Sequence, residues 1–188
     1  METKTKQLPN DEQTISSMNQ SSDLSNIDSK IMAEKRTKNG EKVILLRSKI
    51  KSTQILNTIF SHRIVYHISN ESGVIIGKAL LTVNLTNDNV IVDYTIRPEF
   101  RGKGIGKVML DEIVKEIFKE RVLDNLTFNN GQKTAIDKIS LQINDDNYAS
   151  IKIAKHNGFK KANSYYQLTK DEFMAKMENS DEATLSHN

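Results

Sequence analysis

Apolar and polar residues along the middle of this chain follow two periods, one typical of strands and one typical of helices. Short runs of β-branched and apolar residues, bounded by turn residues, predict strands at 43–46, 63–69, 74–83, 89–96, 139–143 and 159–168. Apolar residues at helical spacing predict helices at 53–60, 107–120 and 148–156. The order of these elements predicts an α/β domain built on a mixed sheet.

The two ends of the chain lack such a pattern. Residues 1–40 hold serine-rich and mixed-charge stretches with sparse apolar residues, which predicts a disordered tail with a short helix at 31–36. A partner-binding arm is the alternative for this tail, although no cluster of anchor residues marks it. Residues 178–188 read as a second disordered tail, so we expect one domain at 41–177. Within it, residues 122–136 are expected to form a solvated loop.

Composition narrows the chemistry. The 188 residues carry a net charge of only +3, which implies no dominant field for nucleic acid. The absence of cysteine excludes disulfides, thiolate metal sites and a cysteine nucleophile, and the four histidines lack metal-ligand spacing. The first residues do not resemble a signal peptide, and no apolar run approaches the length of a membrane span. We therefore expect a cytoplasmic protein without a metal and without a nucleic-acid or membrane partner.

The candidate binding site is the glycine-rich turn Arg101-Gly102-Lys103-Gly104-Ile105-Gly106, which lies between a predicted strand and a predicted helix. Glycines let the backbone approach a ligand closely, and free N–H groups at the start of a helix point at an anion. Arg101 and Lys103 add positive charge where a pyrophosphate would bind. A simple helix entry without a ligand is the alternative interpretation.

Two common nucleotide motifs do not fit this turn. A P-loop requires a serine or threonine after Gly-Lys, whereas Val108 follows Gly106-Lys107 here. The dinucleotide fingerprint requires a third glycine, but that position is Lys107 or Met109, depending on where the count begins.

A different pattern does fit. Arg101-x-x-Gly104-x-Gly106 resembles the Arg/Gln-x-x-Gly-x-Gly/Ala motif of the GNAT superfamily of acetyl-CoA-dependent N-acetyltransferases. A second motif, Asn147-x-x-Ser150 followed by Lys-His-Asn-Gly-Phe at 155–159, is similar to a later segment of the same family. The resemblance covers roughly residues 42–173. It implies a mixed, mainly antiparallel sheet with flanking helices and a V-shaped splay between the fourth and fifth strands.

The resemblance also assigns a cofactor site. Acetyl-CoA would be the co-substrate, with strand backbone groups near Tyr94 and Ile96 pairing with its pantetheine arm. The Ile96 N–H would be the oxyanion donor, and Asn147 would hydrogen-bond the arm from the following helix. The pyrophosphate would be bound by Arg101, Gly102, Lys103, Gly104, Ile105, Gly106 and Lys107.

The catalytic residues depart from the family pattern. Many members carry a tyrosine acid where this chain has Ala154, and a glutamate base where it has Gln142. Ser150 remains as a residue that can face the departing sulfur, as in the branch resembling ribosomal-protein-alanine N-acetyltransferases. Asp93 could deprotonate the amine through water. The alternatives are an ordinary helix-side hydroxyl for Ser150 and a surface carboxylate for Asp93.

These features predict an enzyme that transfers acetyl directly to a primary amine, with a protein or peptide α-amine as the expected acceptor. The stretch between the first two strands has room for about one helix where family members usually place two, which predicts an open acceptor side. A small-molecule amine such as a polyamine or antibiotic is the alternative acceptor. A non-catalytic acyl-CoA-binding module is the alternative class, and the protein is expected to be a monomer or homodimer.

Overall fold

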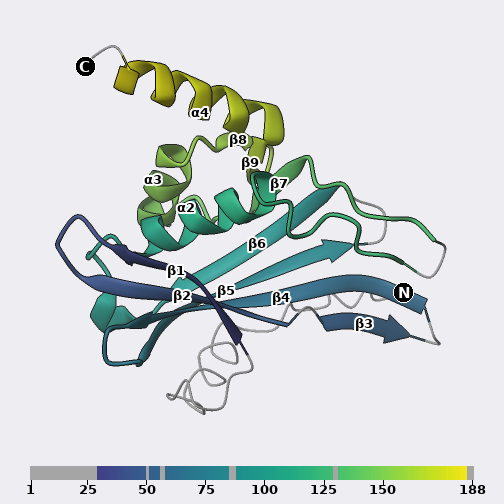
Figure 1. Ribbon diagram of the computed structural model, residues 1–188, viewed down its shortest axis with the longest axis horizontal. Coiled ribbons are helices and arrows are strands. Elements are labelled where there is room, and N and C mark those ends of the chain that lie inside the picture. The colour runs from purple at the N-terminus through teal and green to yellow at the C-terminus, as the bar shows by residue number, and fades with distance from the viewer. Residues whose placement is uncertain (1–28, 50, 56–57, 85–87, 129–130, 186–188) are drawn as a thin grey trace, which may run out of the picture.

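A computed structural model describes residues 29–49, 51–55, 58–84, 88–128 and 131–185. In these residues nine strands form one mixed sheet in the order β1-β2-β4-β5-β6-β7-β9-β8, and β3 pairs with β4 (Figure 1). The strands are β1 (Ser29–Arg36), β2 (Lys42–Ser48), β3 (Lys51–Ile55), β4 (Thr58–Asn70), β5 (Ile75–Asn84), β6 (Asn89–Ile96), β7 (Lys138–Leu141), β8 (Lys160–Ala162) and β9 (Tyr165–Thr169).

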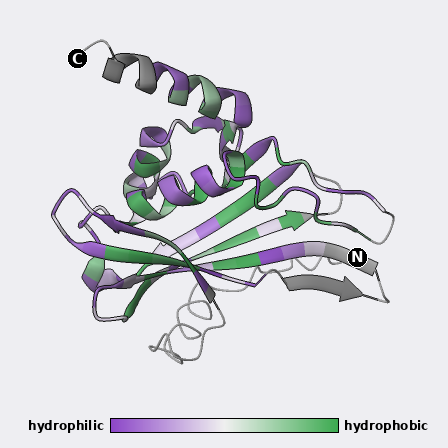
Figure 2. Cartoon of the chain, viewed as in Figure 1, coloured by the Kyte–Doolittle hydropathy of each residue, from purple (hydrophilic) through white to green (hydrophobic). Residues whose placement is uncertain are grey.

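The α-helices α2 (Ile105–Phe118), α3 (Tyr148–His156) and α4 (Lys170–Leu185) lie on one face of this sheet (Figure 1). A short 3-10 helix, η3 (Pro98–Phe100), follows the end of β6. The apolar stripe of α2 is fully buried against the strands, as its spacing predicts, and comprises Met109, Leu110, Ile113 and Ile117. Hydrophobic residues concentrate along the central strands beneath it (Figure 2). The predicted mixed α/β fold is confirmed.

The predicted splay lies between β6 and β7, the one parallel pair of strands in the described sheet. Their pairing begins at Asn89 opposite Lys138 and ends at Ile91 opposite Ser140. β6 continues to Ile96 while remaining paired with β5, whereas β7 ends at Leu141. The second half of β6 therefore has β5 on one side and an open wedge on the other.

The predicted boundaries of the domain were wrong at both ends. Residues 29–36, expected within a disordered tail and in part as a helix, form the edge strand β1. Residues 178–185, expected as a second tail, belong to α4. An edge strand needs few apolar residues because backbone hydrogen bonds to one neighbour hold it, so sparse hydrophobicity did not reveal β1. The rest of the expected N-terminal tail lies outside the described residues.

The helix predicted at 53–60 was also wrong. The described residues of this stretch lie in β3 and at the start of β4, which form an antiparallel pair. A short run of apolar residues fits the period of a helix and that of a strand equally well. Here the stretch forms strands because β3 and β4 pair with each other. The described chain between β2 and β4 contains no helix, whereas about one was expected there.

The described residues of the 122–136 stretch do not form the solvated loop that we expected. Leu123, Phe128 and Ile136 are buried, and the Phe128 ring lies 4.7 Å from the His62 ring of β4, measured between centroids. Burial of these apolar side chains is favourable in free energy, so the segment packs over an end of the sheet.

Candidate active site

The glycine-rich turn opens α2 in the geometry of an anion site. Gly104 is the N-cap residue of α2 and adopts φ of 80°, a left-handed conformation that favours glycine. No side chain caps this helix, so the first-turn N–H groups of Ile105, Gly106 and Lys107 remain available to a ligand. Gly102 also has a positive φ of 76° and stands clear of neighbouring atoms. The turn can therefore bind a phosphate group through its backbone.

The two basic residues of the turn have different tasks in the structure. Arg101 Nε donates to the Ile96 carbonyl oxygen at 3.0 Å, which ties the turn to the end of β6. Lys103 Nζ lies 3.0 Å from Glu41 Oε1 and 5.5 Å from the centre of the Phe100 ring. Lys103 is therefore already engaged, whereas the terminal nitrogens of Arg101 have no partner in the described part of the chain.

Gly106 is a packing residue as well as part of the turn. A Cβ atom at this position would lie 3.2 Å from Ile153 Cδ1 and 3.6 Å from both Ile96 Cγ1 and Tyr94 Cε2. Glycine thus lets α2 approach both β6 and α3, and only the backbone of this buried residue can face a ligand.

The backbone of β6 presents polar groups to the wedge. Arg97 N–H donates to the Ile76 carbonyl oxygen at 2.9 Å, which makes these opposed residues a hydrogen-bonded pair. Bonded and non-bonded pairs alternate in an antiparallel ladder, and the register between β5 and β6 has no shift. Tyr94 and Ile96 therefore belong to non-bonded pairs, so their backbone groups point away from β5 and into the wedge.

Asn147 serves as the N-cap residue of α3. Its Oδ1 accepts from the Ser150 N–H at 3.1 Å. This bond fixes the side-chain amide with its oxygen on the helix and its NH₂ group turned outward. Any contact between Asn147 and a ligand is consequently one in which Asn147 donates.

Tyr94 brings a side-chain hydroxyl that the sequence did not single out, since only its backbone was expected to matter. Its phenol oxygen is buried without a well-formed hydrogen bond in the described structure. Burial raises the Tyr94 pKa, and the nearby Ser150 hydroxyl lowers it in part, so the group stays protonated at neutral pH. Tyr94 and Ser150 therefore meet on the helix-covered side of the wedge, next to Gly106.

Asp93 lies on the opposite face of β6, because successive side chains of a strand alternate. The side chain remains accessible to solvent, yet partial desolvation raises its pKa. The wedge is thus flanked by a carboxylate on one face of the sheet and by two hydroxyls on the other.

The two positions that depart from the family pattern behave differently. Gln142 is exposed just beyond β7, where it has no buried environment. Ala154 is fully buried in α3, so a tyrosine at this position would overpack the interior. Tyr94 is the tyrosine that approaches the wedge instead.

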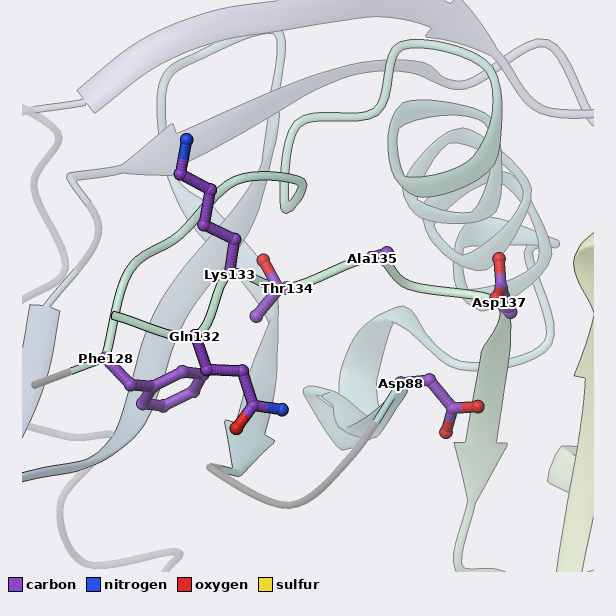
Figure 3. A pocket seen from close by; sticks show the side chains of 7 residues that line it. All are labelled: Asp88, Phe128, Gln132, Lys133, Thr134, Ala135 and Asp137. Carbon is purple, nitrogen blue, oxygen red and sulfur yellow. The ribbon is translucent and has the colours of Figure 1, made fainter. Parts of the chain in front are cut away.

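A cavity of about 250 Å³ lies at the other end of the parallel strand pair (Figure 3). Asp88 and Asp137, which line one side, directly precede β6 and β7, whereas the glycine-rich turn follows β6. The cavity is therefore not part of the wedge. In the described residues no three carboxylate or imidazole side chains gather as metal ligands would, and no helix has the length and hydrophobicity to span a membrane.

Comparisons with known proteins concern the family and the fold. The family model of the acetyltransferase (GNAT) domain matches residues 14–160. A sequence comparison with curated proteins finds no match. Among solved structures, mutant forms of the spermidine/spermine N-acetyltransferase SpeG from Vibrio cholerae superpose with a TM-score of 0.50 at 14% identity, covering 61% of this chain and 69% of that chain. Ribosomal-protein-S5-alanine acetyltransferase from Vibrio fischeri gives a TM-score of 0.48 at 16% identity, covering 59% and 63%. At such identities the likeness concerns the fold alone.

Proposed function

This chain belongs to the GNAT acetyltransferase family, and we propose that it acetylates the α-amine of a protein or peptide. Membership makes it an acetyl-CoA-dependent N-acetyltransferase. Three further points are our proposal. They are the amine that is acetylated, the preference for acetyl-CoA over longer acyl-CoA donors, and the residues that carry out the chemistry.

The residues of the wedge fit coenzyme A. Gly102, Gly104 and the uncapped first turn of α2 would bind the pyrophosphate, with Arg101 supplying charge. The backbone of Tyr94 and Ile96 would pair with the pantetheine arm as a missing strand would, and the Asn147 amide would donate to the same arm. When bound, the cofactor supplies the activated thioester.

The chemistry divides between the two faces of β6. Asp93 would take the proton of the attacking amine through a water molecule on the helix-free face. The Ile96 N–H would donate to the carbonyl oxygen as negative charge develops on it. On the helix-covered face, the Ser150 hydroxyl would donate a hydrogen bond to the departing thiolate, and Tyr94 would donate to Ser150 Oγ and so direct the serine proton toward sulfur. The acetyl group passes directly from sulfur to nitrogen.

The observation that favours a polypeptide acceptor is that no described α-helix covers the face of the sheet around Asp93. Helices α2, α3 and α4 lie on the other face, and the described chain between β2 and β4 contains no helix (Figure 1). An extended chain end can approach such a surface without a closed pocket. Lys78, opposite Thr95 in the register, adds positive charge on this face and would repel a polycation.

The test is a comparison of acceptors at saturating acetyl-CoA. We expect kcat/KM for a peptide with a free N-terminal alanine to exceed that for spermidine by at least about tenfold, which corresponds to about 1.4 kcal/mol. The same peptide with a blocked N-terminus and an internal lysine controls for acetylation of side chains. Lys78→Glu should narrow the gap by improving spermidine. A preference of the wild-type enzyme for spermidine would instead establish a small-molecule acetyltransferase.

A further inference from the structure

Polar side chains from three strands form a row beside Asp93, on the face of the sheet that no described α-helix covers (Figure 1). Thr95 of β6 lies opposite Lys78 of β5, and Lys78 lies opposite His67 of β4. Asp93 comes two residues before Thr95, so its side chain points to the same face. We call Thr95, Lys78 and His67 the polar row. Its members are far apart in sequence, so the pairing of the strands brings them together.

The register of the strands also sets how far the polar row lies from Asp93. Asp93 pairs with Leu80, two residues after Lys78, which makes Lys78 its diagonal neighbour. Diagonal neighbours on one face of an antiparallel pair have side chains that start about 7 Å apart. Consecutive Cα atoms of a peptide are about 3.8 Å apart, so this separation corresponds to about two residues of an extended chain.

The charge of Lys78 is not neutralised by the protein. Lys78 makes no ion pair in the part of the chain that the structure describes. Asp93 is the one acidic residue of β4, β5 and β6. Arg97, which follows β6, differs in this respect, because its Nε lies 3.2 Å from Glu99 Oε1 and its Nη1 donates to the Ile75 carbonyl oxygen at 3.1 Å. The ammonium of Lys78 therefore remains available to an anion.

His67 adds a second group that lacks a partner. Its Nδ1 atom is buried and has no hydrogen bond within the described residues. Burial lowers the His67 pKa, and the nearby Lys78 ammonium lowers it further, so the imidazole is neutral at pH 7. A neutral imidazole that carries its proton on Nδ1 can donate a hydrogen bond from that atom. A buried polar atom without a partner is costly, so a ligand that meets it gains free energy.

The donors of the polar row suit a carboxylate. The Lys78 ammonium, the His67 imidazole and the Thr95 hydroxyl can each donate, and hydrogen bonds between charged groups are the strong ones. A peptide carries a carboxylate close to its N-terminal amine when its second residue is aspartate or glutamate. With the amine at Asp93, such a side chain reaches Lys78 along an extended chain. A lysine or arginine at the same position of the peptide would instead place like charge beside Lys78.

We propose that this enzyme prefers polypeptide acceptors whose second residue is aspartate or glutamate, and that Lys78 and His67 bind this side chain. The inference rests on the proposed function, in which Asp93 accepts the proton of an α-amine. It adds the chemical class of the acceptor to that function.

The test uses three peptides that begin Ala-Glu, Ala-Gln and Ala-Lys and are otherwise identical. At saturating acetyl-CoA, kcat/KM for the glutamate peptide should exceed that for the glutamine peptide about tenfold, because a hydrogen-bonded charge is lost. The lysine peptide should be the poorest of the three. The preference for glutamate should shrink as salt rises, because Lys78 is only partly buried.

Variants of the polar row assign the preference to its residues. Lys78→Met should reduce the ratio of the glutamate to the glutamine peptide to about threefold or less, and Lys78→Glu should make the lysine peptide better than the glutamate peptide. His67→Phe should lower the same ratio about twofold by removing a donor. Lys133→Met, at an exposed lysine outside the polar row, is the matched control and should keep the wild-type ratio. A ratio within one variant does not depend on how much of that enzyme is folded.

The outcomes separate this inference from the proposed function. Equal kcat/KM for the three peptides, or a preference for the lysine peptide, would overturn the inference and leave α-amine acetylation standing. A preference for glutamate that survives unchanged in both Lys78→Met and His67→Phe would overturn it too, because the carboxylate would then bind elsewhere. Turnover of spermidine but of none of the peptides would refute the proposed function and the inference together.

Discussion

At the scale of single residues, several motif residues have structural roles that the motifs do not assign to them. Lys103 is paired with Glu41, Asn147 caps α3, and Gly106 is buried between α2, α3 and β6. The side chain of Tyr94 is the addition, because its buried hydroxyl adjoins Ser150. A buried hydroxyl without a strong partner is costly, which is the physical reason to expect that it gains one when the wedge is filled.

The pairing of Tyr94 with Ser150 gives a prediction for the chemical step. Ser150→Ala should lower kcat by about 10²-fold, since it removes a donor to developing charge, while KM changes little. Tyr94→Phe should lower kcat about tenfold by leaving the serine proton undirected. In the double variant the tyrosine change should have no further effect, because it acts through Ser150.

Single-turnover kinetics should be used, so that product release does not mask the chemistry. Tyr148→Phe is the matched control, since Tyr148 is 77% exposed at the start of the same helix and should be neutral. Additive losses for Tyr94 and Ser150 would show that the two hydroxyls act independently.

At the scale of elements, the strand β1 changes the account of the N-terminal region. It pairs with β2 along seven residue positions, and Met32 and Ala33 pack partly against the core. Its turn to β2 lies against the glycine-rich turn through Thr37 and Glu41. An element that was expected to lie in a disordered tail therefore supports the sheet and lies beside the glycine-rich turn.

Two shortened chains test this role, one beginning at Ser29 and one at Glu41. They differ by β1 and its turn alone, so residues before Ser29 do not enter the comparison. The chain beginning at Glu41 should melt several degrees lower, because a domain of this size loses about 2–4 °C per kcal/mol. It should also bind coenzyme A more weakly. Equal melting temperatures and affinities for the two chains would refute the role of β1.

At the scale of the whole molecule, a buried ion pair joins the sheet to the helix layer. Arg47 Nη1 of β2 lies 2.6 Å from Glu116 Oε1 of α2, and only 5% of the Glu116 side chain is exposed. Burial raises the pKa of Glu116 and of the adjoining Tyr66 phenol. Such a pair fixes how α2 lies on the strands, yet its net contribution to stability is small because both charges are desolvated.

Removing one partner of this ion pair should destabilise the protein more than replacing both partners with apolar residues. Arg47→Met should lower the free energy of unfolding by about 3 kcal/mol, because Glu116 is left charged and buried. Since burial without the cation raises the folded-state pKa of Glu116 further, the loss should be larger at pH 8 than at pH 5.5, where the folded carboxyl takes up a proton. The Arg47→Met, Glu116→Leu double variant should recover most of the stability and lose the pH dependence. Urea unfolding at both pH values measures this, and a single variant as stable as wild type would contradict it.

The sequence by itself determined the parts of this protein that depend on local chemistry. Strand β6, the glycine turn and helix α3 were predicted at their observed positions, since their periodicity, capping residues and glycines act within a few neighbours along the chain. The motifs that carry the family resemblance, including the glycine-rich turn, are also short and local, so the sequence alone was enough to find them. The motif also predicted the splay, which β6 and β7 show once their pairing ends at Ile91.

Only the tertiary structure decided what depends on distant neighbours. Strands β1 and β3 exist because β2 and β4 offer them hydrogen bonds, and Phe128 is buried because the segment that carries it folds back beside His62. The meeting of Tyr94 with Ser150 likewise joins residues that are remote in sequence. Local sequence patterns do not predict such contacts, because the free energy of a long-range contact is gained only when the fold brings the two groups together.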